Sequence, residues 1–141
     1  MSISEVISPL VGRVILGWFF ISEALSYGKQ WEGTIQLMML KDVPAPALLL
    51  AVGIVVMLVG GLSLLLGFQA RHGALLLFAF TIAVSVLMHA YWRIENASAR
   101  SDDYEIFARN IAIAGGLLMI MGLGSGPLSL DNRAGPPKKK R

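Results

Sequence analysis

The sequence predicts an all-α fold, an integral membrane four-helix bundle with cytoplasmic termini. Hydrophobic residues make up 55% of the 141 residues, and charged residues only 15%. A soluble domain typically carries about 25% charged residues, so this chain has too few charges to cover a surface in water. Soluble all-α packing is the alternative, but the sequence offers no amphipathic helix with the polar face that such packing needs.

Four apolar segments are long enough to cross a membrane, because about 20 residues at 1.5 Å each span roughly 30 Å of hydrocarbon. The predicted spans are residues 7–27, 45–67, 73–92 and 106–123. Residues 1–130 would then form a single bundle, and residues 131–141 a basic cytoplasmic tail.

Each span has its own features. Arg13 and Glu23 interrupt the first, and the second begins at Pro44 and Pro46, residues that suit a helix entry. A tight turn of seven residues, 67–73, separates the second span from the third. The fourth begins with Arg109-Asn110, polar residues at the start of an otherwise apolar segment.

Glycines are expected to pack the helices against one another. Gly53, Gly60 and Gly67 recur every seven residues in the second span, which gives that helix a flat face. Helices in a bilayer associate through close backbone approach at small residues. We expect the fourth span to pack in the same way through its own glycines, Gly115, Gly116 and Gly122.

Basic residues predict the orientation. Four spans place both termini on the same side as the tight turn, and this side holds Arg71, Arg133 and the run Lys138 to Arg141. The two longer loops hold fewer basic residues, so the positive-inside rule favours cytoplasmic termini. The terminal run could also bind nucleic acid, but on a membrane protein we interpret it as facing anionic lipid and expect no nucleic-acid partner.

Several kinds of chemistry are excluded by what the sequence lacks. Without cysteine there is no disulfide, thiol redox centre or thiolate metal site. His72 and His89 are 17 residues apart on one predicted helix, about 25 Å, and cannot share a metal or haem. Nucleotide-binding glycine motifs are also missing. We therefore expect no metal site and no intrinsic cofactor.

Polar residues converge at the outer end of the predicted bundle. Three helices end or begin there, and they contribute a candidate pocket of seven residues: Glu23, Tyr27, His89, Trp92, Arg93, Arg109 and Asn110. Ionisable groups inside a span are costly and normally face the bundle. At the opposite end, Arg13 and Asp131 are expected to form a structural pair that closes the bundle.

Each member of the candidate pocket has a structural interpretation as well. Trp92 and Tyr27 suit the aromatic belt at the membrane interface, and Arg93 suits a side chain that snorkels to the headgroups. Glu23 and Arg109 could form a purely structural ion pair. His89 could be a hydrogen-bonded tether or a group that handles protons or contacts a ligand.

The motifs resemble those of the DoxX family of small four-helix bacterial membrane proteins over nearly the whole chain. The first span carries R-x-x-x-G-x-x-F from Arg13, and residues 60–71 read G-G-L-x-L-L-L-G-F-x-x-R. A His-x-x-Trp ends the third span, and residues 107–118 read F-x-R-N-I-A-I-A-G-G-L-L, followed by G-x-G-P-L-S-L-D. Many members carry a Glu where this chain has Met57, and a Lys near the end of the first span, where this chain has Tyr27 with Lys29 shortly after.

This resemblance implies a multi-pass protein of the bacterial cytoplasmic (inner) membrane, a subunit or accessory of a membrane redox system. Its ligand would be a quinone headgroup or a small sulfur-containing or lipid-like molecule, and its partners the bilayer, a redox enzyme subunit or further copies of the chain. An oxidoreductase role is implied by the resemblance alone. The alternatives are a non-catalytic scaffold or anchor and a small-molecule carrier, although four spans without broken helices suit alternating access poorly.

Overall fold

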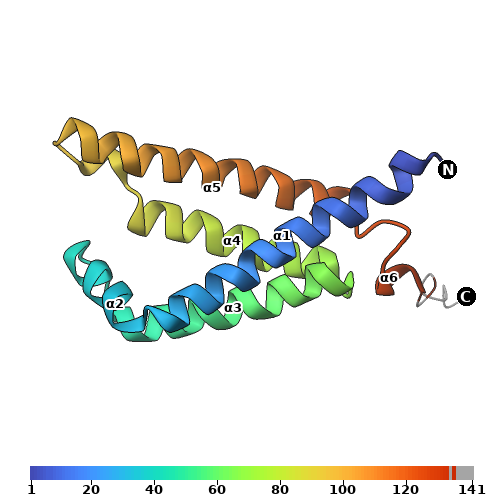
Figure 1. Cartoon of the computed structure of the whole chain (residues 1–141), viewed down its shortest axis with the longest axis horizontal. Helices are drawn as coiled ribbons and strands as arrows, with labels where there is room; N and C mark the ends of the chain where they lie inside the picture. The colour runs from blue at the N-terminus through green and yellow to red at the C-terminus, as the bar shows by residue number, and fades with distance from the viewer. Residues whose placement is uncertain (134, 136–141) are drawn as a thin grey trace, which may run out of the picture.

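The computed structural model describes residues 1–133 and 135. The basic run Lys138 to Arg141, on which part of the tail prediction rests, lies outside these residues. Within the described residues there are four long helices and three short helical segments, in the order α1 (Ile3–Lys29), α2 (Trp31–Leu40), α3 (Pro46–Leu66), α4 (Ala70–Met88), the 3₁₀ helix η1 (Tyr91–Arg93), α5 (Ala97–Leu123) and α6 (Leu130–Arg133). Figure 1 shows how the six α-helices are arranged. Helices α1, α3 and α5, and α4 together with the residues up to Arg93, are long and apolar enough to cross a membrane. The predicted all-α membrane fold is confirmed.

The long helices pack mainly in chain order. Helix α1 packs along α3, α3 along α4 and α4 along α5, whereas α1 and α5 touch only sparsely. Both described chain ends and α6 lie at one end of the bundle, and α2 and the start of α5 lie at the other (Figure 1). We call these the terminal end and the loop end. The loop end is the one that the positive-inside argument places outside the cytoplasm.

Helix boundaries follow local capping signals, and the apolar segments alone do not reveal them. Helix α5 begins at Ala97, well before residue 106, because the Asn96 side chain accepts a hydrogen bond from the Ala99 N–H at 3.0 Å. Helix α4 ends at Met88. Helix α2 occupies most of the first long loop, for which the sequence analysis expected only a polar connection. Hydropathy predicts which residues lie in the lipid. It does not predict where a helix ends, because polar residues can extend the helix beyond the lipid.

Glycines bring α1, α3 and α4 into close contact. A Cβ added at Gly17 would lie 2.7 Å from the Gly61 carbonyl oxygen, so the backbones of α1 and α3 cross at this point. A Cβ at Gly60 would meet the Leu77 side chain at 2.5 Å. The expected packing role of Gly60 on α3 is therefore present.

The same expectation for α5 is wrong for two of its three glycines. A Cβ at Gly115 or Gly122 would meet nothing within 4 Å, and one at Gly116 would meet Leu16 at an ordinary 3.4 Å. Helix α5 instead approaches the core through Leu117 and Ala114, which are buried. Small residues therefore mark a flat helix face, but do not reveal whether a neighbour covers it.

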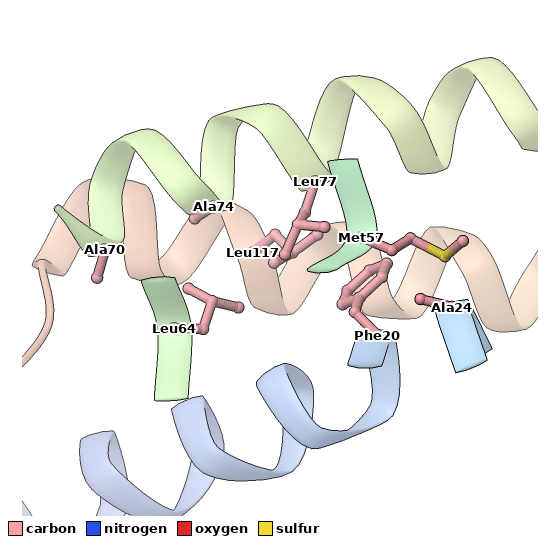
Figure 2. Packing of buried hydrophobic residues seen from close by; sticks show 8 residues of the cluster. All are labelled: Phe20, Ala24, Met57, Leu64, Ala70, Ala74, Leu77 and Leu117. Carbon is pink, nitrogen blue, oxygen red and sulfur yellow. The ribbon is translucent and has the colours of Figure 1, made fainter. Parts of the chain in front are cut away.

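A shared apolar core joins the four long helices. Figure 2 shows its eight buried residues, Phe20, Ala24, Met57, Leu64, Ala70, Ala74, Leu77 and Leu117. Leu64 and Ala70 lie toward the terminal end, next to the tight turn, whereas Phe20, Ala24 and Met57 lie toward the loop end. Phe20 and Met57 of this second group also line the cavity described below, and a smaller buried cluster of Met38, Val43 and Leu50 lies on its far side, toward α2.

Segment 125–131 closes the terminal end through Arg13 and Asp131, each with its own partners. Arg13 Nη1 donates to the Ser125 carbonyl, and Nη2 donates to the Leu128 carbonyl at 2.8 Å. The Asp131 carboxylate accepts the Gln69 and Ala70 N–H groups at 2.6 and 3.0 Å, and so caps α4. Among the described residues the expected Arg13–Asp131 ion pair is not formed. Backbone groups at helix ends lack helical partners. Arg13 therefore bonds to free carbonyls in the segment after α5, and Asp131 bonds to free N–H groups at the start of α4.

Candidate ligand-binding cavity at the loop end

The loop end contains a cavity of about 310 Å³ between α1, α2, α3, α4 and α5. Aromatic side chains Phe19, Phe20 and Phe80 form much of its apolar wall, together with Leu, Ile and Met side chains from α2 to α5. Helix α2 covers one side through Thr34 and Met38. The cavity therefore owes one wall to a helix that hydropathy alone did not predict.

Five of the seven residues in the candidate pocket line this cavity: Glu23, Tyr27, His89, Arg109 and Asn110. The other two do not. Trp92 is 50% exposed, and its ring packs edge-on against Tyr91 and Phe107. Arg93 lines a separate recess beside Lys41 and Asp103. The break after Met88 explains this division, because η1 leaves the axis of α4 and carries both side chains away from the cavity.

Glu23 and Arg109 both line the cavity, but they do not pair with each other. Among the described residues the ion pairs are Lys41–Asp103 and His89–Asp103. The structural Glu23–Arg109 pair considered from the sequence is thus not formed. An acidic and a basic group, from α1 and α5, are both available to a molecule inside the cavity.

His89 is held at the cavity wall by a carboxylate. Its Nδ1 lies 3.2 Å from Asp103 Oδ1, and Asp103 Oδ2 accepts a hydrogen bond from Lys41 Nζ at 2.7 Å. Lys41 also donates to the Met88 carbonyl at the end of α4. Lys41, His89 and Asp103 come from the regions following α2, following α4 and beginning α5, so these contacts tie three elements together.

Thr81 is a further polar group that the sequence analysis missed. It is 4% exposed, it lines the cavity, and its hydroxyl has no hydrogen-bond partner among the described residues. A threonine inside a helix often bonds to the carbonyl one turn back, as Ser85 does to Thr81 at 2.7 Å. In the sequence Thr81 is one hydroxyl in an apolar segment, and no signal there indicated that its oxygen would be unpaired.

Three polar residues of the cavity wall, Glu23, Thr81 and Asn110, lie at a similar depth from the loop end. Thr81 is seven residues before Met88, about 10 Å from the end of α4. Antiparallel α4 and α5 meet at His89 and Asp103, so residues near Asn110 lie beside Thr81. Gly17 on α1 lies against Gly61 on α3, and Gly53 on α3 lies beside Phe80 on α4. These two contacts align α1 with α4 through α3, and they place Glu23 at about the depth of Thr81. Polar atoms from three helices thus share an apolar cavity, an arrangement suited to an amphiphilic ligand.

A metal ion has no obvious place in this arrangement. In residues 1–133 and 135 no three carboxylate or imidazole side chains come together in a way that could hold one. His89 and Asp103 are neighbours, but the third group beside them is the ammonium of Lys41. The donor set therefore suits hydrogen bonding to an organic ligand.

The fold and the cavity together define a multi-pass α-helical membrane protein with an amphiphilic cavity between its helices. The chain belongs to the DoxX family, whose model matches residues 8–90. It is 29% identical to the inner membrane protein YphA of Escherichia coli, over 88% of this chain and 88% of that protein. It is 30% identical to the inner membrane protein YqjF of the same organism, over 90% and 92%.

A more distant likeness extends to eukaryotes. The Surfeit locus protein 4 homolog of Drosophila melanogaster is 27% identical over 86% of this chain, which corresponds to 39% of that protein. No solved structure matches the chain significantly. With four helices able to cross a membrane and two inner membrane relatives, the chain is a multi-pass inner membrane protein in a lipid bilayer.

Both positions at which the sequence departs from the DoxX pattern line the cavity. Met57 on α3 and Tyr27 on α1 are both part of its wall. Met in place of Glu and Tyr in place of Lys remove two side chains that are charged at neutral pH from the site that the resemblance implies. The cavity wall of this chain therefore carries fewer charged side chains than one with both groups would.

Proposed function

We propose that the protein binds a small amphiphilic molecule in the loop-end cavity and serves as a membrane component of a redox system, with a quinone as its candidate ligand. The observation that carries the proposal is the mixed lining of the cavity, in which Glu23, Thr81 and Asn110 lie among aromatic side chains. Ligand sites are typically apolar cavities with a few placed polar groups. A ring bearing oxygens would match both kinds of lining.

Size and access also support a ligand of this class. Ligand cavities commonly measure about 300 to 1,000 Å³, and this one, at about 310 Å³, suits a headgroup better than a whole lipid. Helices α1 and α5 both line the cavity and touch each other only sparsely. An apolar tail can leave between them into the bilayer while the headgroup stays beside Glu23 and Asn110.

The redox part of the proposal rests on the DoxX resemblance, since fold and cavity by themselves do not assign chemistry. A sulfur-containing or lipid-like ligand fits the same walls. The competing function is a scaffold that binds no ligand. That function does not explain why polar side chains line an apolar cavity. Identifying what the cavity holds therefore decides between these functions.

The test is mass spectrometry of small molecules that co-purify with the protein in native lipid discs, made with a cavity-filling variant and a matched control. Val84 lines the cavity, so Val84→Trp should displace the ligand. Val55 lies on α3 with 58% of its surface exposed and does not line the cavity, so Val55→Trp should retain it. We expect a quinone, in its oxidised or its reduced quinol form, in the parent and in Val55→Trp, and at least about tenfold less in Val84→Trp, a loss of about 1.4 kcal/mol of binding free energy.

The outcomes separate the competing functions. A lipid-like or sulfur-containing compound that disappears in Val84→Trp would keep the cavity as the site but overturn quinone as its ligand. No compound differing between the two variants, together with stoichiometric co-purification of a protein partner, would favour the scaffold.

A further inference from the structure

The orientation of His89 limits what its free nitrogen can bind. Asp103 Oδ2 accepts a hydrogen bond from the Lys41 ammonium at 2.7 Å, and its Oδ1 faces His89 Nδ1 at 3.2 Å. A carboxylate beside an ammonium is ionised and accepts hydrogen bonds only. Nδ1 must therefore carry the hydrogen and donate it to Asp103. In the neutral imidazole this leaves Nε2 as an acceptor.

Nε2 is available to a molecule in the cavity. His89 lines the cavity, whereas Asp103 and Lys41 lie outside its wall and border the adjacent recess. Because the Nδ1 edge of the ring faces Asp103, the opposite Nε2 edge is the one left to face the cavity. Among the described residues no donor is bonded to Nε2. An acceptor at the wall of an apolar cavity is satisfied best by a ligand that brings a donor.

We propose that His89 recognises a hydroxyl-bearing ring, and that the cavity therefore prefers a phenol-type or quinol-type headgroup over one whose oxygens cannot donate. The ligand O–H donates to Nε2, while Asp103 and Lys41 fix the tautomer that makes Nε2 an acceptor. Asp103 and Lys41 are positioning residues, because they act on the ligand only through His89. This inference rests on the proposed amphiphile-binding function and specifies the class of headgroup: of the two redox forms of a quinone-type ligand, the reduced quinol is the one that the cavity should bind more tightly.

A matched pair of simple ligands tests this preference without redox chemistry. 4-Butylphenol and 4-butylanisole share ring and tail, but only the phenol can donate a hydrogen bond. Binding is measured by calorimetry with the full-length protein in lipid nanodiscs, with empty nanodiscs subtracted. The buffer is held at about pH 8, above the ordinary pKa of imidazole of about 6.5. The parent protein should bind the phenol about fivefold to tenfold more tightly than the anisole.

Three variants locate the preference. His89→Phe keeps a ring at the cavity wall but removes Nε2, so both ligands should bind equally. Asp103→Asn offers an amide donor to Nδ1 and so favours the tautomer with hydrogen on Nε2, which should abolish or reverse the preference. His72→Phe is the matched control, because His72 lies near the opposite end of α4 and outside the cavity. It should behave as the parent does.

The outcomes distinguish this inference from the function on which it rests. Equal binding of the two ligands by the parent, or a preference that survives His89→Phe, would overturn the role of His89 while leaving an amphiphile-binding cavity. If neither ligand binds above the level of Val84→Trp, the proposed function fails, and the inference fails with it. Circular dichroism shows whether a variant is folded. If either His89→Phe or Asp103→Asn is unfolded, the other of the two tests whether the preference for the phenol depends on His89.

Discussion

At the scale of single residues, Arg13 shows how a charge is accommodated inside a span. It is 2% exposed, and its guanidinium donates to the Ser125 and Leu128 carbonyls. A buried charge is stable only when it is hydrogen-bonded, and the chain after α5 supplies acceptors that no helix uses. The charge therefore holds the segment after α5 against α1. Gly67 allows this approach, since a Cβ there would lie 2.6 Å from Arg13 Nη1.

Removing this charge should loosen the terminal end. Arg13→Gln should lower the free energy of unfolding by about 2 kcal/mol, because hydrogen bonds from a charged donor each contribute roughly 1.5 to 3 kcal/mol and glutamine can replace only part of them. Arg133→Gln, a change at an exposed residue of α6, is the control and should have little effect. Thermal unfolding of both variants in one detergent measures the difference. Equal stability would show that Arg13 does not anchor segment 125–131.

At the scale of elements, the crossing of α1 and α3 fixes the geometry on which the cavity depends. Their backbones touch at Gly17 and Gly61, and from there toward the loop end both helices present cavity-lining residues such as Phe20 and Gly53. In a bilayer, helices gain little from hydrophobic burial against each other and depend on close packing. A change of one methyl group at this crossing must therefore separate the helices.

The glycines of α1 provide an internal comparison for this claim. Gly17→Ala should destabilise the protein by about 1 to 3 kcal/mol, the usual cost of overpacking, because the added methyl would meet the Gly61 carbonyl. Gly12→Ala on the same helix meets nothing within 4 Å and should be neutral or stabilising by up to about 1 kcal/mol. Unfolding in detergent followed by circular dichroism measures both. Equal loss in the two variants would contradict the crossing.

At the scale of the whole molecule, the sequence predicted the membrane bundle and the convergence of Glu23, Tyr27, His89, Arg109 and Asn110. Hydropathy and span length determine which residues reach each end, so this convergence needed no tertiary detail. Trp92 and Arg93 were placed in the pocket wrongly, because the end of α4 at Met88 has no strong sequence signal. Asp103 and Lys41 were missed as partners of His89, since loop residues pair according to tertiary contacts that spacing does not reveal.

The central claim is that Asn110 lines a cavity at the loop end, the end that the positive-inside rule predicts to face away from the cytoplasm, and the absence of cysteine allows a direct measurement. Asn110 and Ile111 are neighbours on α5, but Asn110 lines the cavity, whereas Ile111 is 44% exposed on the surface outside it. Asn110→Cys and Ile111→Cys are treated in intact spheroplasts with a charged, membrane-impermeant methanethiosulfonate, which requires an aqueous thiolate. We predict modification at position 110, slower where a ligand fills the cavity, and little modification at position 111. Equal modification of the two, or modification of position 110 only in inverted vesicles, would contradict the account.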